Sequence, residues 1–266
     1  MKRPHAIFRL GSIVLGTVAL ITVLGFVERS SERTPVKDLS IEVRGDEKGG
    51  FIDEAFVRQQ VLDMNGAVIG VPLGDMDIRG IEERLNAVPW VDNAQAYHTL
   101  DGVLHVRVDQ REPVVRVFDR DGQGFYIDRR GYTMPTSDAF APRVPVALGD
   151  LHLPYKDKVF DVLSGDSLVR GSNLDKVFRV ARLVVDDTFW NALVDQIVVD
   201  MDGEVDLLPR VGAQRIRLGD GKHLEQRFAK LKLFYEKGMP RSDWRRYETI
   251  DLRFADQIVC TQRKTP

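Results

Sequence analysis

Cysteine is nearly absent from this sequence of 266 residues, and an excess of charge of one sign is absent as well. The single cysteine, Cys260, excludes an intramolecular disulfide, so packing alone must hold the core. Its neighbours Ile258 and Val259 predict a small apolar residue in a strand rather than a reactive thiol. The formal net charge of −2 gives no basic footprint, which argues against a nucleic-acid partner.

Catalytic motifs are also lacking. The sequence contains no G-x-S-x-G, H-E-x-x-H or P-loop pattern, and its five histidines are scattered. His98 and His105 flank the turn Asp101-Gly102 and approach each other if the turn joins a hairpin, but no third metal ligand follows at short spacing. We therefore interpret both histidines as exposed strand residues. The sequence predicts no enzyme activity, no cofactor and no metal site.

A long hydrophobic run occurs at the N-terminus. Leu10–Val27 carries no charge, and residues 1–9 before it are basic, which predicts a retained transmembrane helix with a cytoplasmic tail. The alternative is a cleaved signal peptide, whose apolar region is usually about 7–15 residues long. The run is longer than that, and Gly25–Glu28 is a poor cleavage site. Residues 28–38 are polar and predict a linker.

Residues 39–111 predict a small domain in the order strand, helix, helix, strand, strand. Asp53 and Asp77 are plausible N-caps that open the two helices, since apolar residues follow each at helical spacing. Asp101-Gly102 is a strong hairpin turn between the last two strands. The predicted strands are Leu39–Val43, Val91–His98 and Val103–Val108.

Residues 112–262 alternate short strands with helices, and residues 263–266 form a short tail. The predicted helices are Tyr155–Leu163, Asn173–Val185 and His223–Lys237, the last with Lys230-Leu231-Lys232 as a solvated face. The chain ends with predicted strands at Thr249–Phe254 and Gln257–Cys260. This pattern indicates an α+β domain around a mostly antiparallel sheet with packed helices.

The last strand invites two interpretations. A C-terminal strand often lies at a sheet edge, where unpaired backbone groups accept a partner strand. Charged residues such as Arg263 and Lys264 instead protect an edge from such pairing. The sequence leaves both alternatives open.

Six stretches, in this order and behind one hydrophobic run, resemble the FtsQ/DivIB family. The first three are Phe51-Ile52-Asp53-Glu54, then Leu85 to Val91 with Pro89-Trp90 and Ala94, and Gln110-Arg111-Glu112-Pro113-Val114. The others are Tyr126-Ile127-Asp128 with Gly131, Ile216 with Leu218-Gly219, and Ile250-Asp251-Leu252-Arg253-Phe254. Two places depart from the family pattern: Gln110-Arg111 replaces a more usual acidic residue, and Asp256-Gln257 stands where many members have glycine.

The resemblance implies a single-pass protein of the inner membrane at the division septum, with a POTRA domain followed by an FtsQ-type β domain. It implies a non-catalytic scaffold that binds an FtsB/DivIC-like and FtsL-like coiled-coil pair by strand addition at its last strands. The implied contact residues are Arg253, Phe254, Asp256, Gln257, Ile258, Val259 and Cys260. Other division proteins are implied more weakly at the second POTRA strand, Val91–His98.

Two other classes compete with this interpretation. A POTRA-bearing transport or assembly component needs a long run of strands of about ten residues, and the predicted helices at Asn173–Val185 and His223–Lys237 argue against it. A membrane-tethered cell-wall enzyme needs a catalytic set, which the motif search did not find.

Overall fold

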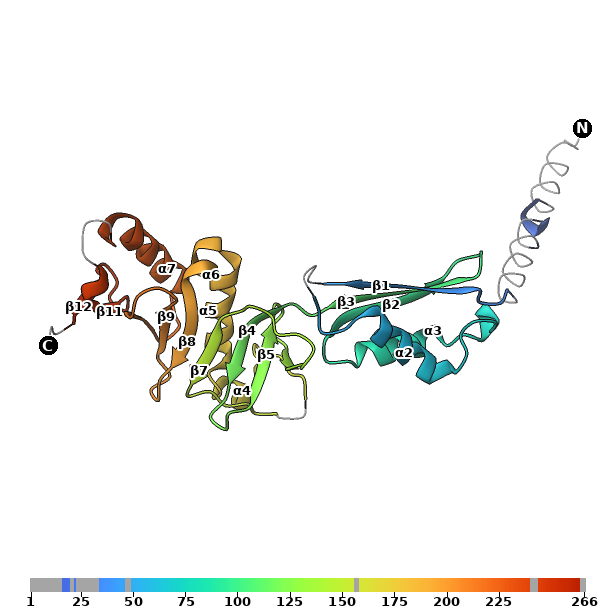
Figure 1. The fold of residues 1–266 in the computed structure, drawn as a ribbon, viewed down its shortest axis with the longest axis horizontal. Coiled ribbons are helices and arrows are strands. Elements are labelled where there is room, and N and C mark those ends of the chain that lie inside the picture. Colours follow the sequence, from blue (N-terminus) through green and yellow to red (C-terminus); the bar gives the residue numbers. More distant parts are fainter. Residues whose placement is uncertain are drawn as a thin grey trace, which may run out of the picture. The chain divides into compact units, whose positions relative to one another are not determined.

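The structure, a computed structural model, describes residues 16–19, 22, 34–45, 49–155, 158–239 and 244–263 (Figure 1). The chain divides into two compact units between Gln110 and Arg111. The predicted span Leu10–Val27 lies mostly outside the described residues, as does most of the predicted linker. Within the described ranges, no helix is long and apolar enough to cross a membrane.

Unit 1 is a three-stranded sheet packed against two helices. Its elements are β1 (Asp38–Arg44), α2 (Glu54–Asn65), the 3-10 helix η1 (Leu73–Asp75), α3 (Ile78–Asn86), β2 (Val91–His98) and β3 (Val103–Gln110). The strands lie in the order β1-β3-β2, with β1 parallel and β2 antiparallel to β3. The predicted order of strand, helix, helix, strand, strand is confirmed.

Both helices of unit 1 begin at the predicted aspartate caps. Each carboxylate accepts the backbone N–H three residues further on, at 2.8 Å from Asp53 and 2.9 Å from Asp77. These bonds satisfy donors that a helix start leaves unpaired. The buried side chains that β3 turns toward the helices are Leu104, Val106 and Val108.

Unit 2 is built on a nine-stranded sheet. Its strands are β4 (Pro113–Phe118), β5 (Gly124–Asp128), β6 (Thr133–Pro135), β7 (Val146–Gly149), β8 (Val194–Val199), β9 (Val205–Pro209), β10 (Arg215–Gly219), β11 (Tyr247–Asp251) and β12 (Val259–Gln262). Their spatial order is β12-β11-β10-β9-β8-β7-β4-β5-β6. Five neighbouring pairs are antiparallel, and β4 with β7, β7 with β8 and β10 with β11 are parallel. The sheet is therefore mixed, with an antiparallel majority.

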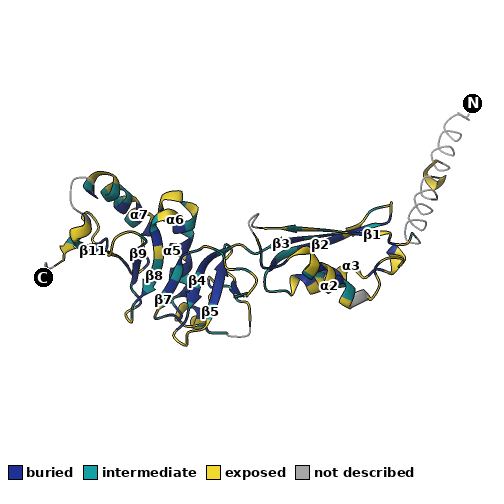
Figure 2. Ribbon diagram, in the orientation of Figure 1, coloured by how far each residue is buried: buried dark blue, intermediate teal, exposed yellow. Residues whose placement is uncertain are grey.

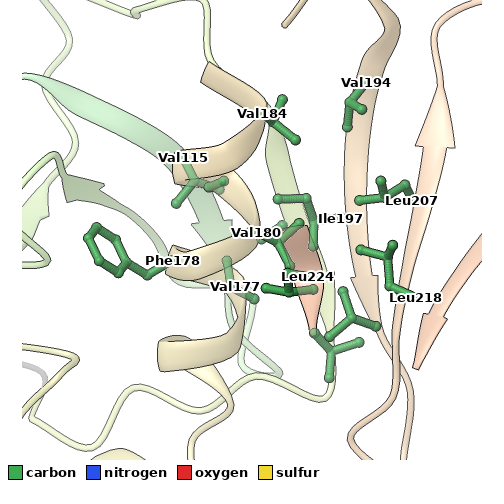
Figure 3. Packing of buried hydrophobic residues seen from close by; sticks show 14 of the residues in the cluster. Val115, Val177, Phe178, Val180, Val184, Val194, Ile197, Leu207, Leu218 and Leu224 are labelled. Atoms are coloured by element: carbon green, nitrogen blue, oxygen red, sulfur yellow. The ribbon is translucent and has the colours of Figure 1, made fainter. Parts of the chain in front are cut away.

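Helices form two of the three crossovers between parallel neighbours, since a tight hairpin joins only antiparallel strands. The third crossover, from β4 to β7, contains β5 and β6. The crossover from β7 to β8 contains α4 (Ser167–Arg170), α5 (Leu174–Asp186) and α6 (Thr188–Leu193). The crossover from β10 to β11 contains α7 (Leu224–Leu233), the π-helical turn η2 (Phe234–Gly238) and the 3-10 helix η4 (Trp244–Arg246). Figure 3 shows Val177, Val180 and Val184 of α5 beside Ile197 and Leu207 of the sheet. In Figure 2, β5 is largely coloured as buried, whereas β4 and β8 alternate between buried and less buried residues.

The predicted helix Tyr155–Leu163 is wrong. Its described part lies along β6 in an irregular, non-helical conformation, where the backbone N–H of Thr133 donates to the Phe160 carbonyl at 3.0 Å. The Phe160 N–H donates back to the Thr133 hydroxyl at 3.2 Å, and the Val162 N–H donates to Gly131 O at 2.9 Å. These backbone groups pair with another segment instead of with their own, so tertiary pairing outweighs the helical spacing of the apolar side chains.

Candidate partner-binding edge

The nine-stranded sheet ends at β12, which pairs with β11 alone among the described strands. The pairing is antiparallel, with Cys260 opposite Ile250 and Val259 opposite Asp251. An edge strand keeps unpaired N–H and C=O groups along its outer side. A segment of another chain can therefore add to the sheet at β12.

Side chains around β12 alternate between the core and the solvent. Ile258 and Cys260 pack against the hydrophobic core of unit 2, whereas Val259 is 39% exposed. Burial raises the pKa of the Cys260 thiol, which keeps it protonated at neutral pH. The prediction that Cys260 is a packed strand residue is confirmed.

The predicted contact residues divide between a loop and β12. Because β11 ends at Asp251 and β12 begins at Val259, the connection between them holds five predicted contact residues, Arg253, Phe254, Asp256, Gln257 and Ile258. The predicted strands Thr249–Phe254 and Gln257–Cys260 are therefore wrong in their bounds. The Asp251 carboxylate accepts the backbone N–H of Arg253 at 3.0 Å, a local turn that ends the strand. Phe254 is 45% exposed in this loop.

Arg253 is turned back onto the sheet. Its guanidinium contacts the Asp251 carboxylate at 2.7 Å and Glu204 at 2.8 Å, and Glu204 also contacts Arg217 of β10 at 3.0 Å. Burial of Asp251 acts to raise its pKa, but the hydrogen bonds from Arg253 outweigh burial and hold the pKa below its usual value. Arg253 therefore fixes the path of the chain where it leaves β11.

Lys230 of α7 holds the same connection from the helix side. Its ammonium donates to the carbonyl oxygens of Leu252 at 3.1 Å, Gln257 at 3.2 Å and Ala255 at 3.4 Å, and to that of Phe254. Burial, together with nearby Arg227, lowers the pKa of Lys230. The predicted solvated face is therefore wrong at Lys230 and also at Leu231, which is fully buried in the core, while Lys232 pairs with Asp187 at 2.9 Å and stays 42% exposed.

Arg263 fixes the far end of β12. Its backbone N–H donates to the Arg246 carbonyl at 2.8 Å, and its guanidinium donates to the Ala213 carbonyl at 2.6 Å. The Arg263 side chain thus binds another segment of the same polypeptide, just before β10. Of the two charges that were candidates to protect the edge, Arg263 is engaged elsewhere, and Lys264 lies outside the described residues.

The opposite end of the sheet, at β6, is covered. The segment around Phe160 exchanges hydrogen bonds with Thr133, and Asp161 forms a bridge with Tyr132. β6 also ends at Pro135, which has no N–H to offer.

The edge strand β2 of unit 1 is partly satisfied by side chains of α3. The Ala94 N–H donates to the Asn86 side chain at 2.9 Å, and the Ala96 N–H donates to the Glu82 carboxylate at 2.8 Å. An added strand at β2 has to displace both side chains. The weaker assignment of partners to Val91–His98 stays a prediction.

The two hairpin histidines are not brought together. In the register of β2 and β3, His98 lies opposite Leu104, while Tyr97 lies opposite His105 and stacks on its ring with centroids 5.0 Å apart. Because neighbouring strand residues alternate in direction, His98 and His105 face opposite sides of the sheet. Across the described ranges, no group of three or more histidine, cysteine or acidic side chains is placed to hold a metal ion.

Comparisons with known proteins give the same two parts. Residues 112–261 match the family described as FtsQ/DivIB, C-terminal related, and residues 35–109 match a POTRA-like domain. The chain is 29% identical over 201 residues to the cell division protein FtsQ of Rhodothermus marinus, covering 74% of this chain and 70% of that protein. It is 28% identical over 192 residues to FtsQ of Salinibacter ruber, covering 69% of each. FtsQ of Geotalea daltonii is 22% identical over 202 residues, covering 76% of this chain and 70% of that protein.

Proposed function

Because this chain belongs to the FtsQ/DivIB family, we propose that it is a non-catalytic scaffold of the cell-division machinery. The similar proteins of Rhodothermus marinus and Salinibacter ruber are named as cell division proteins. In this proposal the chain recruits and links division proteins outside the cytoplasm. It acts by binding alone.

The observation that carries the proposal is the outer edge of β12, which no strand of the described residues covers. Lys230 and Arg253 fix the connection that precedes this strand, and Arg263 fixes the residue that follows it. A strand held at both ends loses little conformational freedom when a partner pairs with it, and this raises affinity. An uncovered edge held in place in this way supports recognition by strand addition.

The proposed partner is an FtsB/DivIC-like protein in a coiled-coil pair with an FtsL-like protein. An extended segment of that partner lies beside β12, where backbone hydrogen bonds supply affinity. Phe254 and Val259 are exposed and meet its side chains, while Asp256 and Gln257 in the loop contribute to specificity. Arg253 acts indirectly, by holding the loop.

Leu10–Val27 is proposed as a single membrane span with a cytoplasmic N-terminus, which places both units outside the inner membrane at the septum. Since the binding work lies beyond the span, an unrelated span of equal length is expected to preserve septal recruitment. Removal of residues 1–27 is expected to abolish it. Fluorescence microscopy of tagged variants in dividing cells measures both outcomes.

The test is a pull-down of the full chain in detergent with an FtsB-like coiled-coil peptide. Phe254→Ala combined with deletion of Gln257–Cys260 is expected to abolish capture, because it removes the exposed ring and half of β12. Met201→Ala is the matched control: its side chain is 84% exposed at another hairpin of unit 2, and capture is expected to persist. Capture by the deletion variant refutes strand addition at β12. Hydrolysis or synthesis of cell-wall material by the purified chain refutes the scaffold proposal instead.

A further inference from the structure

One end of unit 1 exposes apolar side chains on two separate loops. Residues 66–72, Gly-Ala-Val-Ile-Gly-Val-Pro, contain no polar side chain, and Ile69 within them is 58% exposed. The turn of the β2–β3 hairpin carries Leu100, which is 72% exposed. Turns usually carry glycine, proline, asparagine, aspartate or serine. Single exposed aliphatic residues are common on protein surfaces, but two that gather at one end of a domain favour contact with something apolar.

These two loops flank residues 34–37 and are held close together by hydrogen bonds to that segment. The Val36 N–H donates to Val71 O at 2.8 Å, and the Gly70 N–H donates to Val36 O at 2.7 Å. On the other side, the Lys37 N–H donates to Gly102 O at 2.8 Å. Figure 1 shows η1 and the β2–β3 turn at the end of unit 1 where its chain begins.

The same end is the one nearest to the hydrophobic run in the sequence. Residues 28–33 are all that separate Val27 from Thr34. A link of this length spans at most about 25 Å even when fully extended. If a bilayer holds Leu10–Val27, the beginning of unit 1 lies within that distance of the end of the span.

We propose that this end of unit 1 rests on the bilayer surface, with Ile69 and Leu100 inserted at the boundary between headgroups and acyl chains. We call Ile69, Leu100 and Lys37 the membrane-facing tip. Exposed aliphatic side chains gain free energy by burial at that boundary. Lys37 is exposed at the same end and carries a charge opposite to that of lipid phosphates. The inference rests on the membrane span of the proposed function.

A lipid surface fits the tip better than a strand-adding protein does. The tip offers side chains on loops, whereas strand addition needs an open edge. Asp101 adds an acidic group to the turn, and its carboxylate accepts a hydrogen bond from the Thr99 hydroxyl. Contact with the bilayer also limits the tilting of unit 1 about its short link, which steadies its distance from the membrane.

The experiment places a nitroxide spin label on the full chain reconstituted in lipid nanodiscs, in a Cys260→Ser background. The label is attached at Ile69→Cys or at Leu100→Cys, and the control is Met201→Cys, an exposed apolar residue of unit 2. Power saturation compares collisions with dissolved oxygen, which concentrates in lipid, and with a water-soluble nickel chelate. We expect oxygen to dominate at positions 69 and 100 and the nickel chelate to dominate at position 201.

The possible outcomes separate the two proposals. If the chain co-purifies with nanodiscs and all three labels respond to nickel, the tip does not touch lipid and the inference is overturned, while the span stands. If the chain does not co-purify with nanodiscs, both the span and the tip are refuted. Capture of the FtsB-like peptide is measured separately on nanodiscs that carry the unlabelled native chain with Cys260 intact, and its absence refutes strand addition without bearing on the tip.

Discussion

The two ends of the nine-stranded sheet are finished in different ways. At β6 the edge is short, ends at Pro135 and exchanges hydrogen bonds with the segment around Phe160. At β12 the structure describes no covering segment, yet Lys230 and Arg263 fix the chain on both sides of the strand. Proteins usually blunt their exposed edges to avoid unwanted pairing. An edge that is held in place but left uncovered is therefore better explained as a binding surface.

The strongest test of this contrast is a proline scan of β12 at Val259, Cys260 and Thr261, one substitution at a time. Along an antiparallel edge strand, successive N–H groups point alternately to the neighbour and to the outside. Proline at an outward position removes a donor and places its ring against the partner, so we expect the FtsB-like peptide to bind about 100-fold more weakly, a loss of about 3 kcal/mol. Isothermal titration calorimetry on the full chain in detergent measures the affinity.

Ala96→Pro on β2 is the matched control for the scan. It removes the N–H that bonds Glu82, so the melting temperature is expected to fall while peptide affinity is unchanged. Equal loss of affinity from Ala96→Pro and from every β12 variant contradicts the assignment of the binding edge to β12.

Lys230→Met tests whether the connection before β12 must be fixed. The change keeps the aliphatic stem but removes the donor shared by four carbonyl groups. We expect roughly tenfold weaker peptide binding, about 1.4 kcal/mol, because the loop must then be ordered on binding. Hydrogen exchange at Val259–Gln262 is expected to accelerate in the free protein.

Lys232→Met, two residues away on α7, controls for the loss of a positive charge. Lys232 contacts Asp187 and does not contact the connection, so neither affinity nor exchange at β12 is expected to change. If both lysine variants weaken binding alike, charge rather than loop position is responsible.

The pair Asp251–Arg253 predicts a dependence on pH. Because the pKa of Asp251 is lowered in the folded protein, its contribution to stability is present above the unfolded pKa of about 3.9 and is lost as the pH falls through the folded pKa. The melting temperature of the native chain is thus expected to fall more steeply than that of Asp251→Asn as the pH is lowered below about 4. Parallel melting curves for the two proteins across that range contradict a stabilising role for the pair.

The sequence predicted the parts of this edge that depend on local alternation. Ile258 and Cys260 face the core and Val259 faces solvent, as expected for a strand of period two. The end of β11 was missed because the Asp251 side chain captures the backbone of Arg253, which alternation of polarity does not reveal. In unit 1 the aspartate caps and the hairpin turn are local signals, and their predictions are confirmed.

Contacts between distant segments explain the remaining misses. In the sequence, Lys230 looks the same as Lys232, a lysine on the helix surface. Its role depends on carbonyl groups that lie 22 to 27 residues further along the chain. The segment Tyr155–Leu163 has apolar residues at helical spacing, but its backbone pairs with β6. Neither partner can be inferred from spacing within the segment itself.

The smallest effect is expected at the covered end, from Thr133→Val. This change removes the hydroxyl that accepts the Phe160 N–H but leaves the backbone bond from Thr133 to the Phe160 carbonyl. We expect the free energy of unfolding to fall by about 1 kcal/mol, since one hydrogen bond is lost and one cover is loosened. Chemical denaturation measures that change.

Peptide affinity is expected to stay the same, because β6 and β12 are separated by the whole width of the sheet. Stronger peptide binding by the variant means that the partner can also pair with β6 once its cover loosens. In that case covering alone decides which edge of the sheet binds the partner. The fixing of β12 by Lys230 and Arg263 then does not select the binding edge.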